Sequence, residues 1–463
     1  AGASLAILSS LVEKSMLRKL PSGRYEVHEL LRQFAEEKLE VVGELVITVD
    51  AHMHYYAAFM QERTPDIKGR RQLAGLNEIE ADFDNVRAAW QWAVVRKAVD
   101  EIDRALECLY WFCVMRSRLP SGYELLDLAQ QDLTPADEPH LKRIRGRLLS
   151  RAMKGVAGLI GNPDTLRSDV EQALAIAHGF DDQTEIAYCL WSFGLIFMRA
   201  NEYVRAIEVL EQSLARFQML EDRFYQAEVL SDIGHCFRLQ TSQVGRDYLQ
   251  ESLNLKREMG NDIGVAVSLH ELGWQFFVMG EWIEAERHLQ DAYLIQARTG
   301  NRQAMEENLT GLCRLALDRG DLDRVSRLAE EISSIAAEIM NVRHQAILYQ
   351  YLGAVANARQ AYPDARKHFE RVLAMTRDGD LQMLAELGLA YAAFGVDEDQ
   401  RAVRHLVHVM HIDGSLLRFS FVGGIVLLQA ALLYARMGQP ERAAALYALA
   451  FKDSLVSNTY FGR

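Results

Sequence analysis

The chain has 463 residues, of which 49% are hydrophobic and 25% are charged, so it carries enough apolar side chains for a packed core. Its formal net charge is -13 and its sequence pI is near 5.5. This acidic balance argues against a broad surface that neutralises phosphates, and we expect the chain to make no direct contact with nucleic acid.

The first stretch, residues 1–40, is predicted to form a helix, a β-hairpin and a second helix. The helices are expected over Leu5 to Met16 and His28 to Leu39, and the short strands over Met16 to Leu20 and Arg24 to Val27. The strands flank Pro21-Ser22-Gly23, a combination typical of tight turns.

Two runs in this stretch, Leu11 to Leu17 and Gly23 to Ala35, resemble the end of the winged-helix domain of signal-transduction ATPases with numerous domains (STAND), the class that includes NB-ARC proteins. The resemblance implies that His28 reaches the β-phosphate of bound ADP in the resting state. This chain has Val27 and Glu29 where the family signature has methionine and aspartate. The alternative is a histidine that only caps or packs the helix.

The rest of the ATPase machinery of that family is not found in the sequence. No GxxxxGK[ST] motif occurs, so the phosphate-binding loop and its lysine are missing. We therefore expect a C-terminal portion of a longer protein that is no enzyme by itself and holds no cofactor. The resemblance implies that the full-length protein is an ATPase that binds ATP or ADP with magnesium.

Residues 41–100 are predicted to form a helical arm, with two long helices divided at Thr64-Pro65-Asp66. The run from Glu78 to Trp90 resembles the connector that follows the winged helix in bacterial STAND transcription regulators. Apolar residues on one broad stripe of this second helix predict burial against a neighbour. The stripe consists of Phe83, Val86, Trp90 and Trp92. Residues 101–135 are expected to form one further, divergent helical pair.

Residues 136–463 are predicted to form a repeat array, because one pattern recurs there at a nearly constant step. In three units a glycine precedes a phenylalanine by three residues, a small residue follows, and a leucine comes about one turn later. The glycines are Gly194, Gly234 and Gly273, the small residues are Ala206, Gly245 and Ala285, and the leucines are Leu210, Leu249 and Leu289. The glycine allows two helices to approach closely, and the leucine is expected to bury the seam.

Stepping outward by about forty residues gives about eight helix pairs between residues 140 and 452. The glycine slot then falls on Lys154, Cys313, Gly353, Gly388 and Ala431, and the small slot on Leu166, Val325, Ala365, Ala402 and Ala443. The pattern resembles the tetratricopeptide repeat, although HEAT-like pairs remain an alternative because the step is long. The predicted fold is all-α: a right-handed superhelical solenoid of tetratricopeptide-like hairpins behind a small winged-helix remnant with a β-hairpin.

A ligand-binding face is expected on the first helix of each pair, which lines the concave side of such arrays. Peptide-binding tetratricopeptide domains use the positions three before, one after and four after the glycine slot. The predicted ligand-binding residues are Trp191, Ser231, His235, Arg238, His270, Trp274, Phe277, Arg314, Gln350 and Asn357. The alternative is that the aromatic residues form inter-repeat core and the charges a solvated face.

Histidines and cysteines give weaker signals. His405, His408 and His411 recur every three residues without an accompanying carboxylate in the sequence, so no metal site is predicted. Five cysteines, an odd number without a CxxC pair, indicate buried thiols in a reducing cytoplasm. The longest apolar run, Gly423 to Ala435, is too short to span a bilayer, so no membrane association is expected.

Two functions remain open at this point. The first is a sensor: an unknown inducer, a small molecule or a protein, binds the concave groove and controls the chain's own ATPase module, and thereby oligomerisation and transcription. The second is a passive scaffold for protein assembly, the frequent role of such repeats. The winged-helix remnant with His28 favours the sensor, because a scaffold has no use for that motif.

Overall fold

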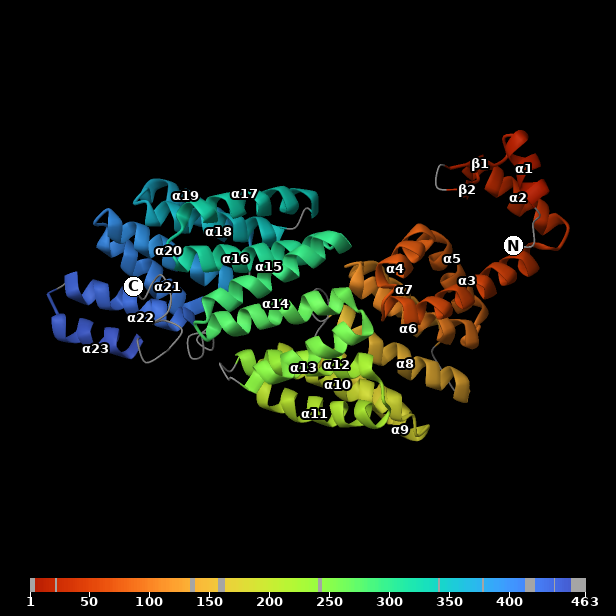
Figure 1. The fold of residues 1–463 in the computed structure, drawn as a ribbon, viewed down its shortest axis with the longest axis horizontal. Coiled ribbons are helices and arrows are strands. Elements are labelled where there is room, and N and C mark those ends of the chain that lie inside the picture. The colour runs from red at the N-terminus through yellow and green to blue at the C-terminus, as the bar shows by residue number, and fades with distance from the viewer. Residues whose placement is uncertain are drawn as a thin grey trace. The chain divides into compact units, whose positions relative to one another are not determined.

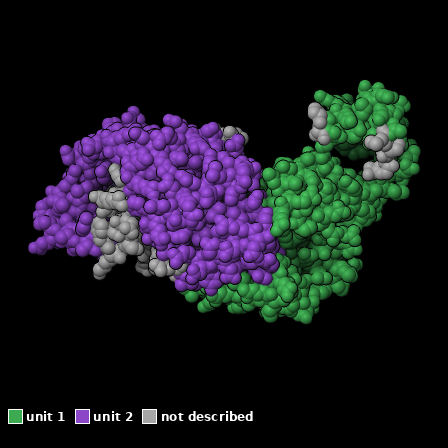
Figure 2. Space-filling view, in the orientation of Figure 1, with its two compact units in different colours: residues 1–222 green, residues 223–463 purple. Residues whose placement is uncertain are grey.

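The computed structural model describes residues 5–20, 23–133, 138–156, 163–239, 244–339, 342–376, 379–412, 421–436 and 438–450. The chain divides into two compact units, Ala1–Asp222 and Arg223–Arg463, which Figure 2 shows in different colours. Each unit is built almost entirely of helices (Figure 1). Among the described residues, no helix combines the length and the apolar character needed to cross a membrane.

The N-terminal part has the predicted order of helix, hairpin and helix. Helix α1 (Leu5–Glu13) is followed by strands β1 (Arg18–Lys19) and β2 (Tyr25–Glu26) and by helix α2 (Glu29–Val41). The strands are antiparallel, with Arg18 opposite Glu26, and they are shorter than predicted. Gly23 has a φ of +81°, a left-handed conformation that a turn residue other than glycine adopts less readily.

The next five helices pack together in unit 1. They are α3 (Leu45–Ile67), α4 (Gln72–Ala81), α5 (Phe83–Arg96), α6 (Val99–Met115) and α7 (Leu119–Asp132). Helix α6 packs against both α3 and α5, so the predicted arm and the predicted divergent pair form one helical body. Three residues of the predicted stripe on α5, Phe83, Val86 and Trp90, are buried, and Trp92 is half-buried. Trp90 donates from Nε1 to the carbonyl oxygen of Leu125 at 2.9 Å.

The predicted break at Thr64-Pro65-Asp66 does not divide two helices. Pro65 lies inside the last turn of α3, and the helix ends at Ile67. A proline removes one N–H donor but does not prevent the turn that follows it from closing. Here that turn closes because the amide of Lys68 donates to the carbonyl oxygen of Thr64.

The rest of the described chain forms eight consecutive helix pairs, as predicted. Unit 1 holds α8 (Pro139–Val156) with α9 (Pro163–Gly179), and α10 (Gln183–Arg199) with α11 (Tyr203–Met219). Unit 2 holds α12 (Arg223–Leu239) with α13 (Val244–Met259), α14 (Asp262–Val278) with α15 (Trp282–Thr299), α16 (Arg302–Asp318) with α17 (Leu322–Ile339), α18 (Val342–Ala358) with α19 (Tyr362–Met375), α20 (Gly379–Gly395) with α21 (Asp399–Ile412), and α22 (Phe421–Arg436) with α23 (Pro440–Ala450). The two helices of each pair pack on each other.

The predicted contact between glycine and leucine sets the spacing within the pairs. A Cβ atom added at Gly234 would lie 2.5 Å from Cγ of Leu249, and one added at Gly273 would lie 2.7 Å from Cγ of Leu289. Gly194 meets Leu210 in the same way. Because no side chain fits at these points, the backbones of the paired helices approach as closely as the repeat pattern predicts.

The glycine slot in the pair of α20 and α21 was assigned to the wrong residue, Gly388. Gly388 does not face Ala402 on its own partner helix α21, because a Cβ at Gly388 would overlap the ring of Phe369 on α19 of the preceding pair. Ala390 takes the predicted place instead, since it packs in one cluster with Ala402 and Leu406 of α21, which follow it by the same twelve and sixteen residues that separate Gly273 from Ala285 and Leu289. Ala390 is the twelfth residue of α20, as Gly353 is of α18.

Cysteine burial follows the prediction. All five cysteines, Cys108, Cys113, Cys189, Cys236 and Cys313, are buried free thiols. Burial raises the pKa of Cys313 to about 12, which keeps this thiol protonated at neutral pH.

Substituting alanine at Gly234 should destabilise unit 2. The new Cβ would meet both Leu249 and the carbonyl oxygen of Gly245, the latter at 3.0 Å, and overpacking of this kind costs about 1–3 kcal/mol. The measurement is urea unfolding followed by circular dichroism. Gly179→Ala is the control, since nothing lies within 4 Å of that added Cβ. Equal unfolding midpoints for the two variants would contradict the close-approach interpretation.

Candidate functional site

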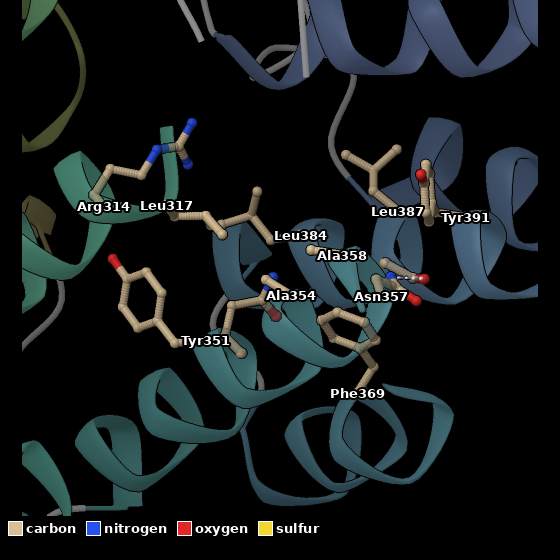
Figure 3. Close-up of a pocket in the computed structure, with 12 residues that line it drawn as sticks. Arg314, Leu317, Tyr351, Ala354, Asn357, Ala358, Phe369, Leu384, Leu387 and Tyr391 are labelled. Atoms are coloured by element: carbon tan, nitrogen blue, oxygen red, sulfur yellow. Dashed lines mark hydrogen bonds between the residues drawn. The ribbon is translucent and has the colours of Figure 1, made fainter. Parts of the chain in front are cut away.

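A pocket of about 70 Å³ lies in unit 2 among helices α16, α18 and α20, with one side chain from α19. Its lining is mostly apolar. The lining residues are Arg314, Leu317, Gln350, Tyr351, Ala354, Asn357, Ala358, Phe369, Leu384, Leu387, Gly388 and Tyr391. In Figure 3, Arg314 and Tyr351 lie at one end of the pocket, and Leu387 and Tyr391 lie at the other.

The pocket exists because small residues face large ones across neighbouring helices. Ala354 and Ala358 occupy one face of α18, and Gly388 occupies the adjoining face of α20. The ring of Phe369 fills the space beside both Gly353 and Gly388, and it forms one wall. Helices α18 and α20 pack directly on each other, which holds the wall in place.

Two amide side chains give the pocket its polar character. Asn357 is only 7% exposed and donates from Nδ2 to the carbonyl oxygen of Gly388 at 2.9 Å. This bond fixes the orientation of the amide, because only the nitrogen can donate to a carbonyl. The other atom, Oδ1 of Asn357, and likewise Oε1 of Gln350, are buried and accept no hydrogen bond from the described residues.

The charge on Arg314 is balanced inside the protein. Its Nε donates to Oδ2 of Asp318, one turn further along α16, at 3.0 Å. Asp318 is 1% exposed, so the pair is shielded from solvent. The guanidinium also lies 6.0 Å from the ring centroid of Phe277 on α14. Arg314 is therefore a neutralised cation and not an open anion site.

Three of the predicted ligand-binding residues line this pocket: Arg314, Gln350 and Asn357. The structure brings them together from two neighbouring repeats, α16 and α18, at the positions that the spacing rule selects. Their role in binding remains a prediction. The same rule selects Leu317 and Ala354, which also line the pocket.

The repeat pattern did not predict the pocket residues on α20. Leu384, Leu387 and Tyr391 line the pocket together with Gly388, but the glycine slot of the repeat had been assigned to Gly388. With the slot moved to Ala390, the positions three before, one after and four after become Leu387, Tyr391 and Phe394. Counting back from Ala402 and Leu406 with the spacing of the other units would have found Leu387 and Tyr391, but not Leu384.

His235 and Arg238 on α12 share a carboxylate with α14. Nδ1 of His235 lies 2.9 Å from Oε2 of Glu271, and Nε of Arg238 donates to the same oxygen at 3.1 Å. Burial alone would raise the pKa of Glu271, but Arg238 and His235 outweigh it and hold the pKa well below its ordinary value. The two predicted residues thus form a satisfied ionic cluster. Glu271 was not predicted as its centre.

His270, Trp274 and Phe277 lie on α14 as predicted, and they contact one another. The His270 and Trp274 rings meet edge to face at 6.3 Å, and the Trp274 and Phe277 rings at 5.4 Å. Nδ1 of His270 lies 3.0 Å from Oδ1 of Asn308 on α16. Ser231 on α12 is buried, with 6% exposure. His270, Trp274 and Phe277 contact residues of the next first helix, α16, and none of these four side chains lines the pocket.

Trp191 is a core residue and does not line the pocket described above. It is fully buried in unit 1, stacked on Trp111 at 6.2 Å and in edge contact with Tyr188. The alternative interpretation, aromatic residues as inter-repeat core, applies to this residue. The reason is that helix α6, which the repeat pattern did not include, brings Trp111 against it.

His28 begins helix α2 as its N-cap, with Nδ1 accepting a hydrogen bond from the amide of Leu30 at 3.2 Å. The capping alternative is therefore realised in this structure, and contact with a nucleotide remains a prediction. The hairpin beside it is tied to the helical body. Nη1 of Arg24 donates to Oδ2 of Asp82 at 2.8 Å, and Asp82 also accepts from Tyr56 at 3.1 Å.

The histidines of α21 do have a carboxylate neighbour. Glu386 of α20 is 3% exposed and accepts from Nδ1 of His405 at 2.6 Å and of His408 at 2.7 Å. Glu386 lies 19 residues before His405 in the sequence, so the spacing of the histidines did not indicate it. No group of three or more potential ligands among the described residues is arranged to hold a metal ion. The side chain of His411 lies outside the described residues.

Comparison with known proteins identifies the fold. No family model matches the chain, and no curated protein matches it. The apo form of RapI is similar with a TM-score of 0.55 and 13% identity, covering 78% of this chain and 97% of that one. A Rap protein complexed with competence and sporulation factor is similar with a TM-score of 0.52 and 14% identity, covering 81% and 99%.

A third solved structure is a STAND protein with a tetratricopeptide repeat sensor from Pyrococcus horikoshii. It matches with a TM-score of 0.49 and 15% identity, covering 83% of this chain and 60% of that chain. The likeness to the two Rap structures establishes the fold alone. The chain is an all-α solenoid of tetratricopeptide-like helix hairpins, preceded by a small two-stranded hairpin.

Replacing Glu271 by glutamine should destabilise the protein at neutral pH and much less in acid. The folded pKa of this carboxyl is lowered from 4.5, so its stabilising effect is present above the unfolded pKa and is lost as pH falls through the folded pKa. We expect a loss of about 1.5–3 kcal/mol at neutral pH, the size of a hydrogen bond to a charged group.

The measurement for Glu271→Gln is urea unfolding in neutral and in acidic buffer, with the exposed Glu307→Gln on α16 as control. A difference from wild type that stays constant with pH would show that Glu271 does not stabilise the fold through its charge.

Proposed function

We propose that the chain is the signal-sensing region of a STAND-type switch, and that unit 2 binds the signal in the pocket among α16, α18 and α20. The observation that carries the proposal is the pair of buried amide oxygens, on Gln350 and Asn357, that face an apolar pocket without a donor among the described residues. Leaving such acceptors unsatisfied costs about 1–3 kcal/mol each, so the pocket is suited to a partner that donates to them.

The lining supports binding rather than catalysis. The hydroxyl of Tyr351 donates to the carbonyl oxygen of Thr310 at 2.9 Å, and burial raises its pKa, so it is a poor acid or base. Arg314 is paired with Asp318. A Rap protein of the same fold has been solved with competence and sporulation factor bound, which supports a signal-binding role for such a solenoid.

The proposal also includes transmission of ligand binding to a nucleotide switch, and this part rests on the resemblance around His28. Unit 1 offers a physical route for it. Lys68 at the end of α3 lies 2.5 Å from Glu107 of α6, and Glu107 lies 3.2 Å from the buried Arg151 of α8. Arg151 also pairs with Glu185 of α10 at 2.8 Å. Buried ion pairs of this kind tolerate little displacement, because separation leaves a charge uncompensated.

A binding energy difference of about 5.5 kcal/mol is needed to turn a two-state switch from mostly off to mostly on. A groove with many contacts can supply that difference. The proposed output is nucleotide-dependent activation of transcription, with oligomerisation, in the longer protein that the resemblance implies.

Ala354→Trp should abolish ligand binding without unfolding the protein. Ala354 is partly exposed in the pocket, so a larger side chain there can fill the space. The protein would be incubated with a small-molecule and peptide extract of cells, separated from unbound material, and analysed by native mass spectrometry. We expect a retained mass with wild type and none with Ala354→Trp.

Val342→Trp is the matched control, because Val342 begins the same helix and is 52% exposed. It should retain the mass. Equal retention by both variants would place the ligand elsewhere and overturn the proposed site.

His28→Ala tests the nucleotide part in the longer protein. If the imidazole contacts the β-phosphate, the variant should release a fluorescent ADP analogue faster, by at least about tenfold for one lost hydrogen bond to a charged group. His28→Asn, which can still cap α2, separates capping from phosphate contact. Unchanged release in both variants would leave His28 as a cap only.

A further inference from the structure

An N-terminal module, residues 5–41, comprises α1, the β-hairpin and α2. None of its side chains that the structure describes, in residues 6–20 and 23–41, is buried. The helical body that follows is different, because α3, α5 and α6 each contribute several buried apolar residues to a core. Hydrophobic burial therefore fixes the body but contributes little to the position of the module.

A short link joins the N-terminal module to the helical body. Residues 42–44 lie between the end of α2 at Val41 and the start of α3 at Leu45. Gly43 in this link has a φ of +76°, and nothing lies within 4 Å of the position that a Cβ would take. Glycine adopts both signs of φ with nearly equal ease, and a few residues between two elements are enough to absorb a change of direction. The link has the properties of a hinge between α2 and α3.

Asp82, between α4 and α5, is an acceptor that the helical body holds in place. Its Oδ1 accepts from the hydroxyl of Tyr56 on α3 at 3.1 Å and from Nδ2 of Asn85 on α5 at 3.0 Å. The side chain of Asp82 is 17% exposed, so it is largely shielded from water. A carboxylate that is already oriented loses little conformational freedom when its partner binds, and this strengthens the bond.

Arg24 joins the hairpin to this carboxylate. Its Nη1 donates to Oδ2 of Asp82 at 2.8 Å, and its Nη2 donates to Oδ1. Two parallel bonds between a guanidinium and a carboxylate are stronger and more directional than a single-bonded surface ion pair. Asp82 follows Arg24 by 58 residues, so the pair connects the module to the body across the link that contains Gly43.

We propose that the Arg24–Asp82 pair is a releasable latch. While the pair is formed, it fixes the direction of the N-terminal module, and when it breaks, the module turns about Gly43 without disturbing the core of the body. The module carries His28 at the start of α2, so the state of the latch decides where this residue lies relative to the body. The inference concerns unit 1 alone and holds whether or not the pocket in unit 2 binds a ligand.

The test is the distance between two spin labels, measured by double electron–electron resonance on the full chain. The labels are placed on introduced cysteines at Lys19 of β1 and Arg87 of α5, both exposed positions, and the five native cysteines are buried and do not compete. We expect one narrow distance in the parent protein and a broad distribution in Arg24→Met and in Asp82→Ala. The population outside the parent distance should rise at least about tenfold, because bonds between charged groups are lost.

Arg18→Met is the matched control, because Arg18 is an exposed arginine of the same hairpin and lies in β1. It should keep the narrow distance. A second pair of labels lies within the module, at Lys19 and at the exposed Glu37 of α2. The distance between these two labels should stay the same in every variant, because the module moves as one body.

A broad distribution in the parent protein, or a narrow one that survives in either Arg24→Met or Asp82→Ala, would overturn the latch. Equal broadening in Arg18→Met would do the same. Broadening of the second label pair would show that Arg24 or Asp82 stabilises the fold of the module itself, and this outcome would also contradict a latch.

Discussion

The structure depends on the close approach of two helices at a glycine. Where Gly234 or Gly273 stands, the partner helix places Leu249 or Leu289 into the space that a Cβ would take. This contact fixes the rotation of the first helix about its axis, and the face beside the seam is left for other contacts. The candidate site is a consequence, because Gln350 and Asn357 lie on that face of α18.

The pocket forms where the pattern changes. In the pair of α18 and α19, Phe369 replaces the usual leucine and contacts two glycines, Gly353 and Gly388, on successive first helices. A larger ring between two glycines holds these helices together at the level of the ring, while the alanines beside it fill less volume. A cavity can therefore persist within an array that elsewhere packs tightly. The regular repeat positions the helices, and the change from leucine to Phe369 leaves the volume of the pocket.

The sequence was sufficient to predict the helix pairs and to place Arg314, Gln350 and Asn357 on the faces that line the pocket, because periodicity determines both the pairs and the faces of their helices. That these residues bind a ligand stays a prediction. It failed where a partner comes from outside the period. Trp191 is buried by a tryptophan of α6, and Glu386 meets two histidines of the next helix. These contacts depend on how helices of different sequence pack against one another. The spacing of residues within one helix does not predict such packing.

Two polar clusters lie on the predicted face, Glu271 with its partners and the pair of Gln350 and Asn357, and the difference between them favours the second as the proposed site. Glu271 has two partners, Arg238 and His235, so that cluster is complete and has no need of a ligand. The oxygens of Gln350 and Asn357 are buried without a donor from the described chain. Native proteins keep few such atoms, because each one costs stability. A ligand that donates to these oxygens removes the free-energy cost of leaving them unpaired beside the pocket. The carboxylate of Glu271 is already paired, so it has no such cost for a ligand to remove.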